Sequence, residues 1–194
     1  MKLVIGIVGP PLAGKETAAD AFAELLGRDG FSVSRHRFSD VLRETLDLWG
    51  MPHGRDNEQR LAQLMARLAE GTLSRAVEHR IANDAADVGI LDGVRWFSDE
   101  EMIRSFAKRG IKNLLVYVLA SPDVRYERLR RRNRAGEASV TRAEFDRQMA
   151  AENETYIPEI GGRADIKLMN EYADVQDFRK DAARAYQKTI RPLL

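Results

Sequence analysis

Short apolar runs alternate along the chain with longer stretches in which apolar residues recur every three or four positions. The runs LVIGIV and LLVYVL are apolar at consecutive positions, as strands covered by helices on both faces must be. This alternation predicts an α/β fold, a three-layer sandwich with a five-stranded, mainly parallel sheet. We expect the strands at about Leu3–Val8, Ser32–Phe38, Val88–Leu91, Leu114–Leu119 and Asp165–Met169.

The stretches between these runs have the periodicity of amphipathic helices. The expected helices cover roughly Lys15–Leu26, Asp40–Gly50, Glu58–Glu70, Thr72–Asn83, Asp99–Arg109, Pro122–Arg132, Thr141–Asn153 and Val175–Thr189. The segment TRAE, Thr141–Glu144, has the pattern of a capping box and predicts the start of one helix. Because no repeat or low-complexity linker divides the 194 residues, we expect one domain.

Charge and composition narrow the possible partners. Thirty-one Lys and Arg residues against 30 Asp and Glu residues leave a formal charge of +1, so nucleic acid is a possible but not a favoured partner. The absence of cysteine excludes a disulfide framework and a thiolate metal site. The apolar start KLVIGIV is too short for a signal peptide or a membrane span. We therefore expect a soluble cytoplasmic protein without membrane contact, as a monomer or a homodimer.

The segment GPPLAGKETAAD completes the phosphate-loop pattern G-x-x-x-x-G-K between Gly9 and Lys15. It follows a predicted strand and opens a predicted helix, so backbone N–H groups near Gly9, Ala13 and Gly14 can turn inward around phosphate oxygens. Lys15 would then reach the terminal phosphates of ATP. The alternative is a tight strand-to-helix turn with a solvated lysine.

Glu16 stands where a serine or threonine that touches magnesium is expected. Here the loop resembles the nucleoside monophosphate kinase superfamily, whose relatives include loops reading G-K-G-T or G-K-D-T. The GKET of this chain looks like the acidic variety of phage deoxynucleoside monophosphate kinases. The resemblance implies that Thr17 bonds the α-phosphate and that carboxylates and water hold Mg²⁺. By its charge Glu16 would lie near that metal; the alternative is a solvated residue stabilised by the helix dipole.

The segment GILDGVRWFSDEE carries a second group of candidates. A short apolar run that ends in an acid is the usual form of the strand beside a phosphate loop, so Asp92 is a candidate for holding Mg²⁺ or its water. Asp92 and Arg95 form D-x-x-R, which resembles the L-D-G-F-P-R stretch of adenylate kinases. The resemblance implies that Arg95 grips the phosphate of the acceptor, which suits a bidentate arginine. A turn aspartate and a surface ion pair are the alternatives.

The segment ASPDVRYERLRRRNR places Arg125, Arg128 and Arg132 on one stripe of a helix. Three arginines on one face can converge on a triphosphate and neutralise charge in the transition state. The stretch resembles the helix and lid of the same superfamily, with the lid at about residues 125–145. It implies Arg128 under the base or phosphates of ATP and Arg132 on the transferring phosphoryl group. A solvated helix face or a nucleic-acid patch are the alternatives.

Two further segments concern the acceptor and the adenine. RFSDVLRETLDLWG resembles a stretch of deoxynucleotide kinase relatives and puts Asp40 and Arg43 toward the acceptor, within a helical segment at about residues 40–86. Asp40 would orient the attacking oxygen, or else serve as a helix N-cap. ADIKLMNEYADVQDF resembles the last strand and base-contacting loop of dephospho-coenzyme-A-kinase-like relatives, which implies Asn170 beside the adenine. A turn asparagine is the alternative.

The resemblance implies a P-loop NTPase fold with a small arginine-rich lid, as one kinase domain over residues 1–194. It would move the γ-phosphoryl group of ATP, with Mg²⁺, to a nucleotide-like acceptor, first of all a nucleoside or deoxynucleoside monophosphate. Dephospho-coenzyme A and a hydroxymethylated base in DNA are alternative acceptors, and a regulatory nucleotide-binding module is the alternative class. His36, His53 and His79 have no ligand spacing and no evident partner acid, which argues against a histidine metal site.

Overall fold

The computed structural model describes residues 1–132, 140–149 and 155–194. Its five strands form one sheet in which every neighbouring pair is parallel, in the order β2-β3-β1-β4-β5. They are β1 Leu3–Val8, β2 Val33–Arg37, β3 Val88–Val94, β4 Lys112–Leu119 and β5 Ile166–Met169. The predicted α/β fold is confirmed, and all the predicted strands occur within a few residues of their expected bounds.

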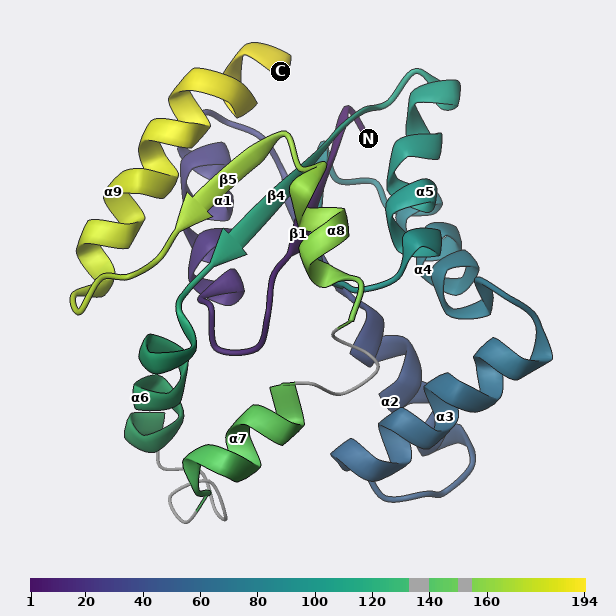
Figure 1. Ribbon diagram of the computed structural model, residues 1–194. Coiled ribbons are helices and arrows are strands. Elements are labelled where there is room, and N and C mark those ends of the chain that lie inside the picture. Colours follow the sequence, from purple (N-terminus) through teal and green to yellow (C-terminus); the bar gives the residue numbers. More distant parts are fainter. Residues whose placement is uncertain (133–139, 150–154) are drawn as a thin grey trace.

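Helices cover both faces of the sheet, which gives the predicted three layers (Figure 1). On one face α1, Lys15–Arg28, packs against α9, Val175–Ala185. The other face carries α4, Thr72–Ala82, α5, Phe97–Ser105, and α8, Ile157–Gly162. β1 runs through the middle of the sheet and is buried along its whole length, which explains its unbroken apolar sequence.

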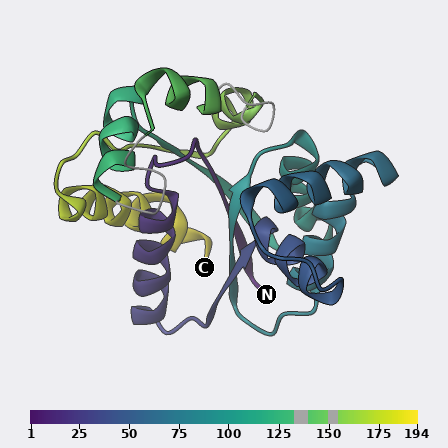
Figure 2. The ribbon, with the colours of Figure 1, turned by 90° about the horizontal axis from the view of Figure 1, so that it is seen from below.

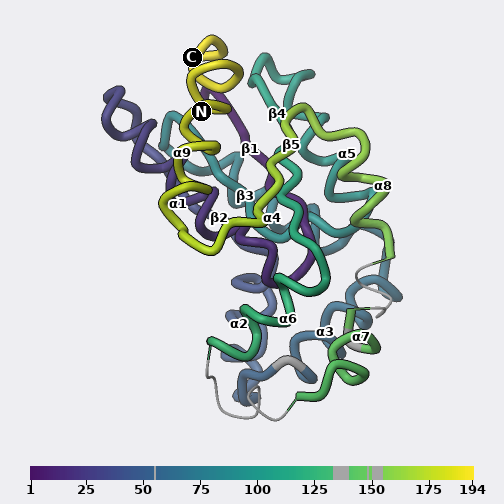
Figure 3. The backbone as a smooth tube through the Cα atoms, turned by 60° about the vertical axis from the view of Figure 1, so that its left-hand side comes forward, coloured from purple at the N-terminus to yellow at the C-terminus, as the bar shows by residue number. Residues whose placement is uncertain are grey.

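The remaining helices lie beyond the carboxyl ends of the strands. They are α2 Phe38–Leu48, α3 Arg55–Leu68, α6 Pro122–Arg132 and α7 Arg142–Met149. Figures 1 and 3 both place them at this end, and the view from below separates α6 and α7 from α2 and α3 (Figure 2). The short helices η1, η3 and η4 cover Phe106–Arg109, Tyr186–Ile190 and Arg191–Leu193.

Two apolar clusters hold the layers together. One joins the sheet to α1 and α9 around Phe22, Phe178 and Tyr186. The other joins it to α4, α5 and α8. Within this second cluster Gly6 lets α5 approach closely, because a Cβ there would lie 2.4 Å from Cδ1 of Ile103. Burial of both faces therefore fixes the position of β1 and of the loop that follows it.

Helix bounds differ from the sequence prediction in a few places. α8 was not predicted, because IPEIGG is too short and too rich in Pro and Gly to show a helical period. The predicted helix Thr141–Asn153 appears as α7, while its expected last residues lie outside the described ranges. The predicted capping box is confirmed: Glu144 accepts hydrogen bonds from the backbone N–H and the hydroxyl of Thr141, at 2.7 and 2.8 Å. Among the described residues no helix has both the length and the apolar character that crossing a membrane requires.

Candidate functional site

The loop between β1 and α1 has a backbone shape that glycine alone fits at two positions. Gly9 has φ 156° and Gly14 has φ 102°. A Cβ at Gly9 would lie 2.2 Å from the carbonyl oxygen of Val118, and one at Gly14 would lie 2.3 Å from Nδ2 of Asn170. The loop is thus curled against the ends of β4 and β5, directly before the N-terminus of α1, as a phosphate cradle requires.

Lys15 turns back over this loop. Its Nζ donates hydrogen bonds to the carbonyl oxygens of Gly9 and Pro10, at 2.8 and 3.1 Å. The ammonium group is therefore already held on the loop by weak acceptors that phosphate oxygens can replace. Ala13 is buried, and Thr17 lies half-buried in the first turn of α1.

Asp92 lies on β3, beside the loop strand, in register with Ile7 of β1 and Arg37 of β2. Its Oδ1 is buried and has no hydrogen-bond partner among the described residues. A buried acceptor without a donor costs about 1–3 kcal/mol, and a bound cation would remove that cost. A carboxylate oxygen is also a ligand that Mg²⁺ prefers. Asp92 therefore fits the predicted magnesium role.

The rest of a magnesium coordination shell would have to come from elsewhere. The described residues contain no group of three or more His, Cys, Asp or Glu side chains that could hold a metal ion. Mg²⁺ in nucleotide enzymes commonly keeps several waters and takes further oxygens from the phosphates, so one or two carboxylates are sufficient. A single buried carboxylate oxygen at Asp92, with water and phosphate oxygens as the remaining ligands, would agree with this pattern.

Glu16 is exposed in the first turn of α1, and its Oε1 accepts a hydrogen bond from Nη2 of Arg37 at 2.7 Å. One turn further along α1, Asp20 accepts from Nη1 of Arg35 at 2.5 Å. Glu16 is thus not simply solvated, because its carboxylate is paired with Arg37. The sequence analysis missed Arg37, whose only local signal is its place at the end of a predicted strand.

Arg95 is positioned by Asp99, a second residue that the sequence analysis missed. The Asp99 carboxylate accepts hydrogen bonds from the backbone N–H groups of Arg95 and Trp96, at 2.9 and 3.0 Å, and from the hydroxyl of Ser74 at 2.7 Å. Burial raises the pKa of Asp99, although these hydrogen bonds oppose the rise. Asp99 lies in the first turn of α5 and fixes the turn from β3 that carries Arg95.

Arg128 connects α6 to the phosphate loop. Its Nη1 donates to the carbonyl oxygens of Leu12 and Ala13, at 3.1 and 3.3 Å. Its Nη2 donates to the carbonyl oxygens of Asn170 and Tyr172, at 3.0 and 3.3 Å, and to Oδ1 of Asn170 at 2.9 Å. Burial lowers the pKa of Arg128. Asn170, only 5% exposed, donates from Nδ2 to the carbonyl of Ala13 at 2.8 Å, so both residues hold the loop itself.

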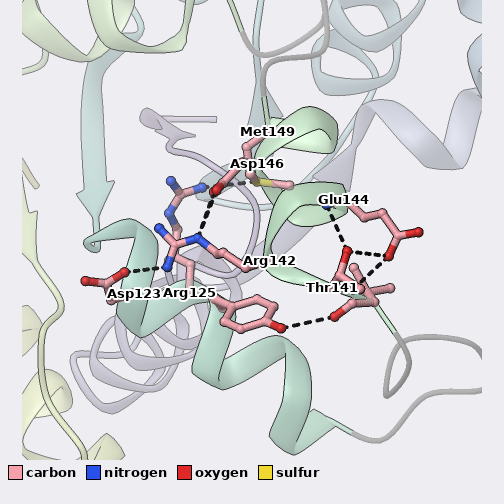
Figure 4. Close-up of polar contacts among 9 residues, drawn as sticks. Asp123, Arg125, Thr141, Arg142, Glu144, Asp146 and Met149 are labelled. Carbon is pink, nitrogen blue, oxygen red and sulfur yellow. Dashed lines mark hydrogen bonds and ion pairs between the residues drawn. The ribbon is translucent and has the colours of Figure 1, made fainter.

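The other two arginines of the predicted stripe lie differently. Arg125 is buried, and its Nη1 lies 3.1 Å from Sδ of Met149 (Figure 4). Its guanidinium carbon is 5.7 Å from the centre of the Phe145 ring. The expectation that Arg125 faces the triphosphate is therefore wrong, because it packs between α6 and α7. Arg132 is exposed at the last residue of α6.

Arg142 adds a second connection between α6 and α7. It forms ion pairs with Asp123, at 2.5 Å, and with Asp146, at 2.9 Å (Figure 4). The hydroxyl of Tyr126 also donates to the carbonyl oxygen of Val140 at 3.2 Å. The described part of the predicted lid, residues 125–145, thus has packing of its own; residues 133–139 lie outside the described ranges.

Asp40 and Arg43 lie together on α2. The helix begins at Phe38, so Asp40 belongs to its first turn and is not its N-cap. Nη1 of Arg43 is 3.8 Å from Oδ1 of Asp40, and its Nε donates to Oε1 of Glu58 on α3 at 3.0 Å. The two predicted acceptor residues are therefore neighbours, held by the contact between α2 and α3.

Two histidines have acidic partners, contrary to the sequence analysis. Nε2 of His36 lies 3.0 Å from Asp84, and Nε2 of His53 lies 2.7 Å from Asp47. Burial lowers the pKa of His36, although Asp84 partly offsets this. The partners come from other turns of the chain, which spacing along the sequence does not reveal.

Known proteins resemble this chain in sequence and in fold. A family model described as an AAA domain matches residues 5–154. A UPF0200 protein from Staphylothermus marinus is 30% identical over 186 residues, covering 92% of this chain and 89% of the relative. Another, from Hyperthermus butylicus, is 29% identical over 184 residues, covering 94% and 92%.

Two solved structures share the fold. A shikimate kinase from Bacteroides thetaiotaomicron has a TM-score of 0.59 at 18% identity, covering 95% of this chain and 97% of that one. A gluconokinase from Sinorhizobium meliloti has a TM-score of 0.56 at 14% identity, covering 98% and 94%. The sheet, the loop and the matching family model define a P-loop NTPase fold, as the sequence predicted. More closely, the chain belongs to the AAA domain family and to the UPF0200 proteins.

Proposed function

We propose that the protein is an ATP- and Mg²⁺-dependent phosphotransferase that moves the γ-phosphoryl group to a nucleotide-like acceptor, first of all a nucleoside or deoxynucleoside monophosphate. The main support is the loop from Gly9 to Lys15, which leads into the N-terminus of α1. Its backbone conformation requires glycine at two positions, and Nζ of Lys15 lies over the loop. Two neighbours in fold are named as kinases, which supports the reaction type.

On the donor side the loop N–H groups and the start of α1 would bind the β- and γ-phosphates. Lys15 exchanges its two carbonyl acceptors for phosphate oxygens as the nucleotide enters. Asp92 and Glu16 would hold Mg²⁺, directly or through water, and the ion would neutralise charge between the phosphates. Arg128 holds the base of the lid on the loop, and Arg132 would neutralise charge on the transferring group.

On the acceptor side Arg95 would grip the phosphate of the acceptor from the turn that Asp99 fixes. Asp40 and Arg43 would orient the attacking oxygen from α2. A loose transition state asks little of a base, so positioning matters more than proton removal. Closure of the lid would exclude the water that otherwise hydrolyses ATP.

Other acceptors keep the same donor site. Dephospho-coenzyme A and a hydroxymethylated base in DNA are alternatives, and the formal charge of +1 disfavours long contacts with duplex DNA. A regulatory nucleotide-binding module is the alternative class, but such switches carry a magnesium-linked serine or threonine where this chain has Glu16. A cytoplasmic location and a monomeric or homodimeric state belong to the same proposal.

The test is phosphoryl transfer from labelled ATP with Mg²⁺ to a panel of ribo- and deoxynucleoside monophosphates, dephospho-coenzyme A, hydroxymethylated DNA, shikimate and gluconate. A sample without acceptor measures hydrolysis. Lys15→Ala should remain folded and lose transfer. Lys108→Ala should keep it, because Lys108 is an exposed residue of η1, before the amino end of β4. Full activity in Lys15→Ala would refute the mechanism; ATP binding without transfer to any acceptor would favour the regulatory module.

A further inference from the structure

Two ion pairs join the edge strand β2 to α1, the helix that follows the phosphate loop. Arg35 and Arg37 are two positions apart on a strand, so their side chains leave the sheet on the same face. Glu16 and Asp20 are four positions apart on a helix and share one side of it. The pairs are Arg35 with Asp20, at 2.5 Å, and Arg37 with Glu16, at 2.7 Å.

The pair nearer the loop lies on the same face of the sheet as Asp92. Arg37 and Asp92 are partners in the parallel register of β2 and β3, and register partners point to the same face. That face is the one covered by α1, because Val33 and Val88, an earlier pair in this register, both contact the cluster around α1. Arg37 is therefore the cation on the side of the site where Asp92 and Glu16 are the candidate magnesium residues.

The pairing with Arg37 offsets the charge repulsion that Glu16 would cause in the phosphate site. A carboxylate in the first turn after Lys15 repels the phosphates of a nucleotide that arrives without a metal ion. The paired Arg37 neutralises the carboxylate and holds it toward β2. The Glu16 side chain is 68% exposed, so it can leave Arg37 for the water shell of a bound cation without breaking a buried contact.

We propose that Arg37 is the positioning residue for Glu16: it draws the carboxylate toward β2 and so sets how strongly nucleotide binding depends on Mg²⁺. This inference rests on the proposed function, because it requires that the loop binds a nucleoside triphosphate. Arg37 acts through Glu16 and needs no contact with the nucleotide. The site thereby distinguishes metal-bound from metal-free ATP, the discrimination that a serine or threonine ligand otherwise contributes.

The charges determine whether each substitution raises or lowers the affinity for ATP. Arg37→Met leaves Glu16 unpaired, so ATP in EDTA should bind about fivefold more weakly, the effect of two like charges several ångströms apart in a largely aqueous setting. ATP with Mg²⁺ should change much less, because the cation offsets the carboxylate. Glu16→Gln removes a candidate carboxylate for the cation, so ATP with Mg²⁺ should bind more weakly and the two affinities should come closer together. Arg37→Lys keeps the charge and should restore most of the wild-type ratio.

The experiment measures the affinity of the full chain for a fluorescent ATP analogue, in EDTA and in excess Mg²⁺. The variants are Arg37→Met, Arg37→Lys, Glu16→Gln and the double variant Glu16→Gln/Arg37→Met. Arg35→Met is the matched control: it breaks the neighbouring ion pair and should lower thermal stability without changing the affinity ratio. The double variant should behave like Glu16→Gln alone, because Arg37 has no carboxylate left to position.

The outcomes separate the possible failures. An unchanged ratio in Arg37→Met overturns the inference, and so does an equal weakening in the Glu16→Gln background, which would mean that Arg37 attracts the phosphates directly. If Arg37→Met does not fold, Glu16→Gln decides. The ratio of its affinity in Mg²⁺ to its affinity in EDTA must then fall below that of the wild type. A wild-type chain that binds the analogue in neither buffer rejects the proposed function itself, and with it this inference.

Discussion

Asn170→Ala should both destabilise the protein and weaken ATP binding. Asn170 follows β5 and is almost completely buried between the phosphate loop and α6. The substitution removes the hydrogen bond from Nδ2 to the carbonyl of Ala13, at 2.8 Å, and the one that Oδ1 accepts from Arg128, at 2.9 Å. The backbone hydrogen bond from Asn170 to Leu119 at 2.7 Å remains, so β5 keeps its end.

The expected loss is the sum of these two contacts. A neutral hydrogen bond contributes about 1 kcal/mol and one with a charged donor about 2 kcal/mol, so Asn170→Ala should lower the free energy of unfolding by about 3 kcal/mol. Arg128 keeps its contacts to Leu12, Ala13 and Tyr172, which limits the loss. ATP binding should weaken because the carbonyl of Ala13 loses the hydrogen bond from Asn170 that helps to hold it in place.

Urea unfolding of the wild type, Asn170→Ala, Arg128→Ala and the double variant gives the coupling energy of the pair. We expect a coupling of about 1–2 kcal/mol, because the two side chains share one hydrogen bond and the same loop. Titration with ATP on the same samples shows whether loop order affects affinity. A stability change below about 0.5 kcal/mol in Asn170→Ala would refute the reasoning, since exposed turn asparagines show such small effects.

Three further results are expected. Gly9→Ala should cost about 1–3 kcal/mol in the free energy of unfolding and abolish ATP binding, because its Cβ would meet the carbonyl of Val118; wild-type binding would contradict this. Burial lowers the pKa of folded His36 below that of an ordinary histidine, so the unfolded chain binds more protons and stability falls as the pH drops through about 6.5, the ordinary pKa of histidine. His36→Gln should flatten that fall in thermal melts, and an unchanged slope would exclude His36 as its source. Thr141→Ala should lower the stability of α7 by about 1 kcal/mol, which faster amide hydrogen exchange in α7 would report. Unchanged exchange would show that the capping box does not stabilise the helix.

The fold and the loop could be predicted because both depend on local sequence. Consecutive apolar residues mark strands buried on both faces, and the spacing from Gly9 to Lys15 fixes a turn between a strand and a helix. Asp92, near the end of β3, lies beside the strand that leads into the loop, as its position after an apolar run predicted. Helix α8 was missed because its six residues include Pro158 and two glycines.

The contacts of the site could not be predicted, because they depend on which elements become neighbours in space. Arg37 meets Glu16 because β2 lies beside β3 and because the Arg37 side chain extends to the face of the sheet that α1 covers. The helical period predicts Arg125 and Arg128 on one side of a helix, but it does not show that Arg125 packs against α7 while Arg128 bonds the phosphate loop. In the sequence Asp99 looks like any acidic residue in the first turn of a helix. In the structure its carboxylate accepts a hydrogen bond from the turn before α5.

The two sides of the site are built in different ways, and this decides where the acceptor must be sought. The donor loop is held by glycine geometry and by hydrogen bonds from Arg128 and Asn170 to its own carbonyls, so its shape does not depend on the acceptor. The helices α2 and α3 share a small apolar cluster and the contact between Arg43 and Glu58. Phe38 and Val41 anchor α2 in the cluster that packs on the sheet, so only the exposed side chains of α2 and α3 can change without disturbing the sheet. In the proposed function the loop would bind the donor, whereas the acceptor would be chosen by side chains of α2 and of the turn after β3, and a panel of acceptors tests those side chains directly.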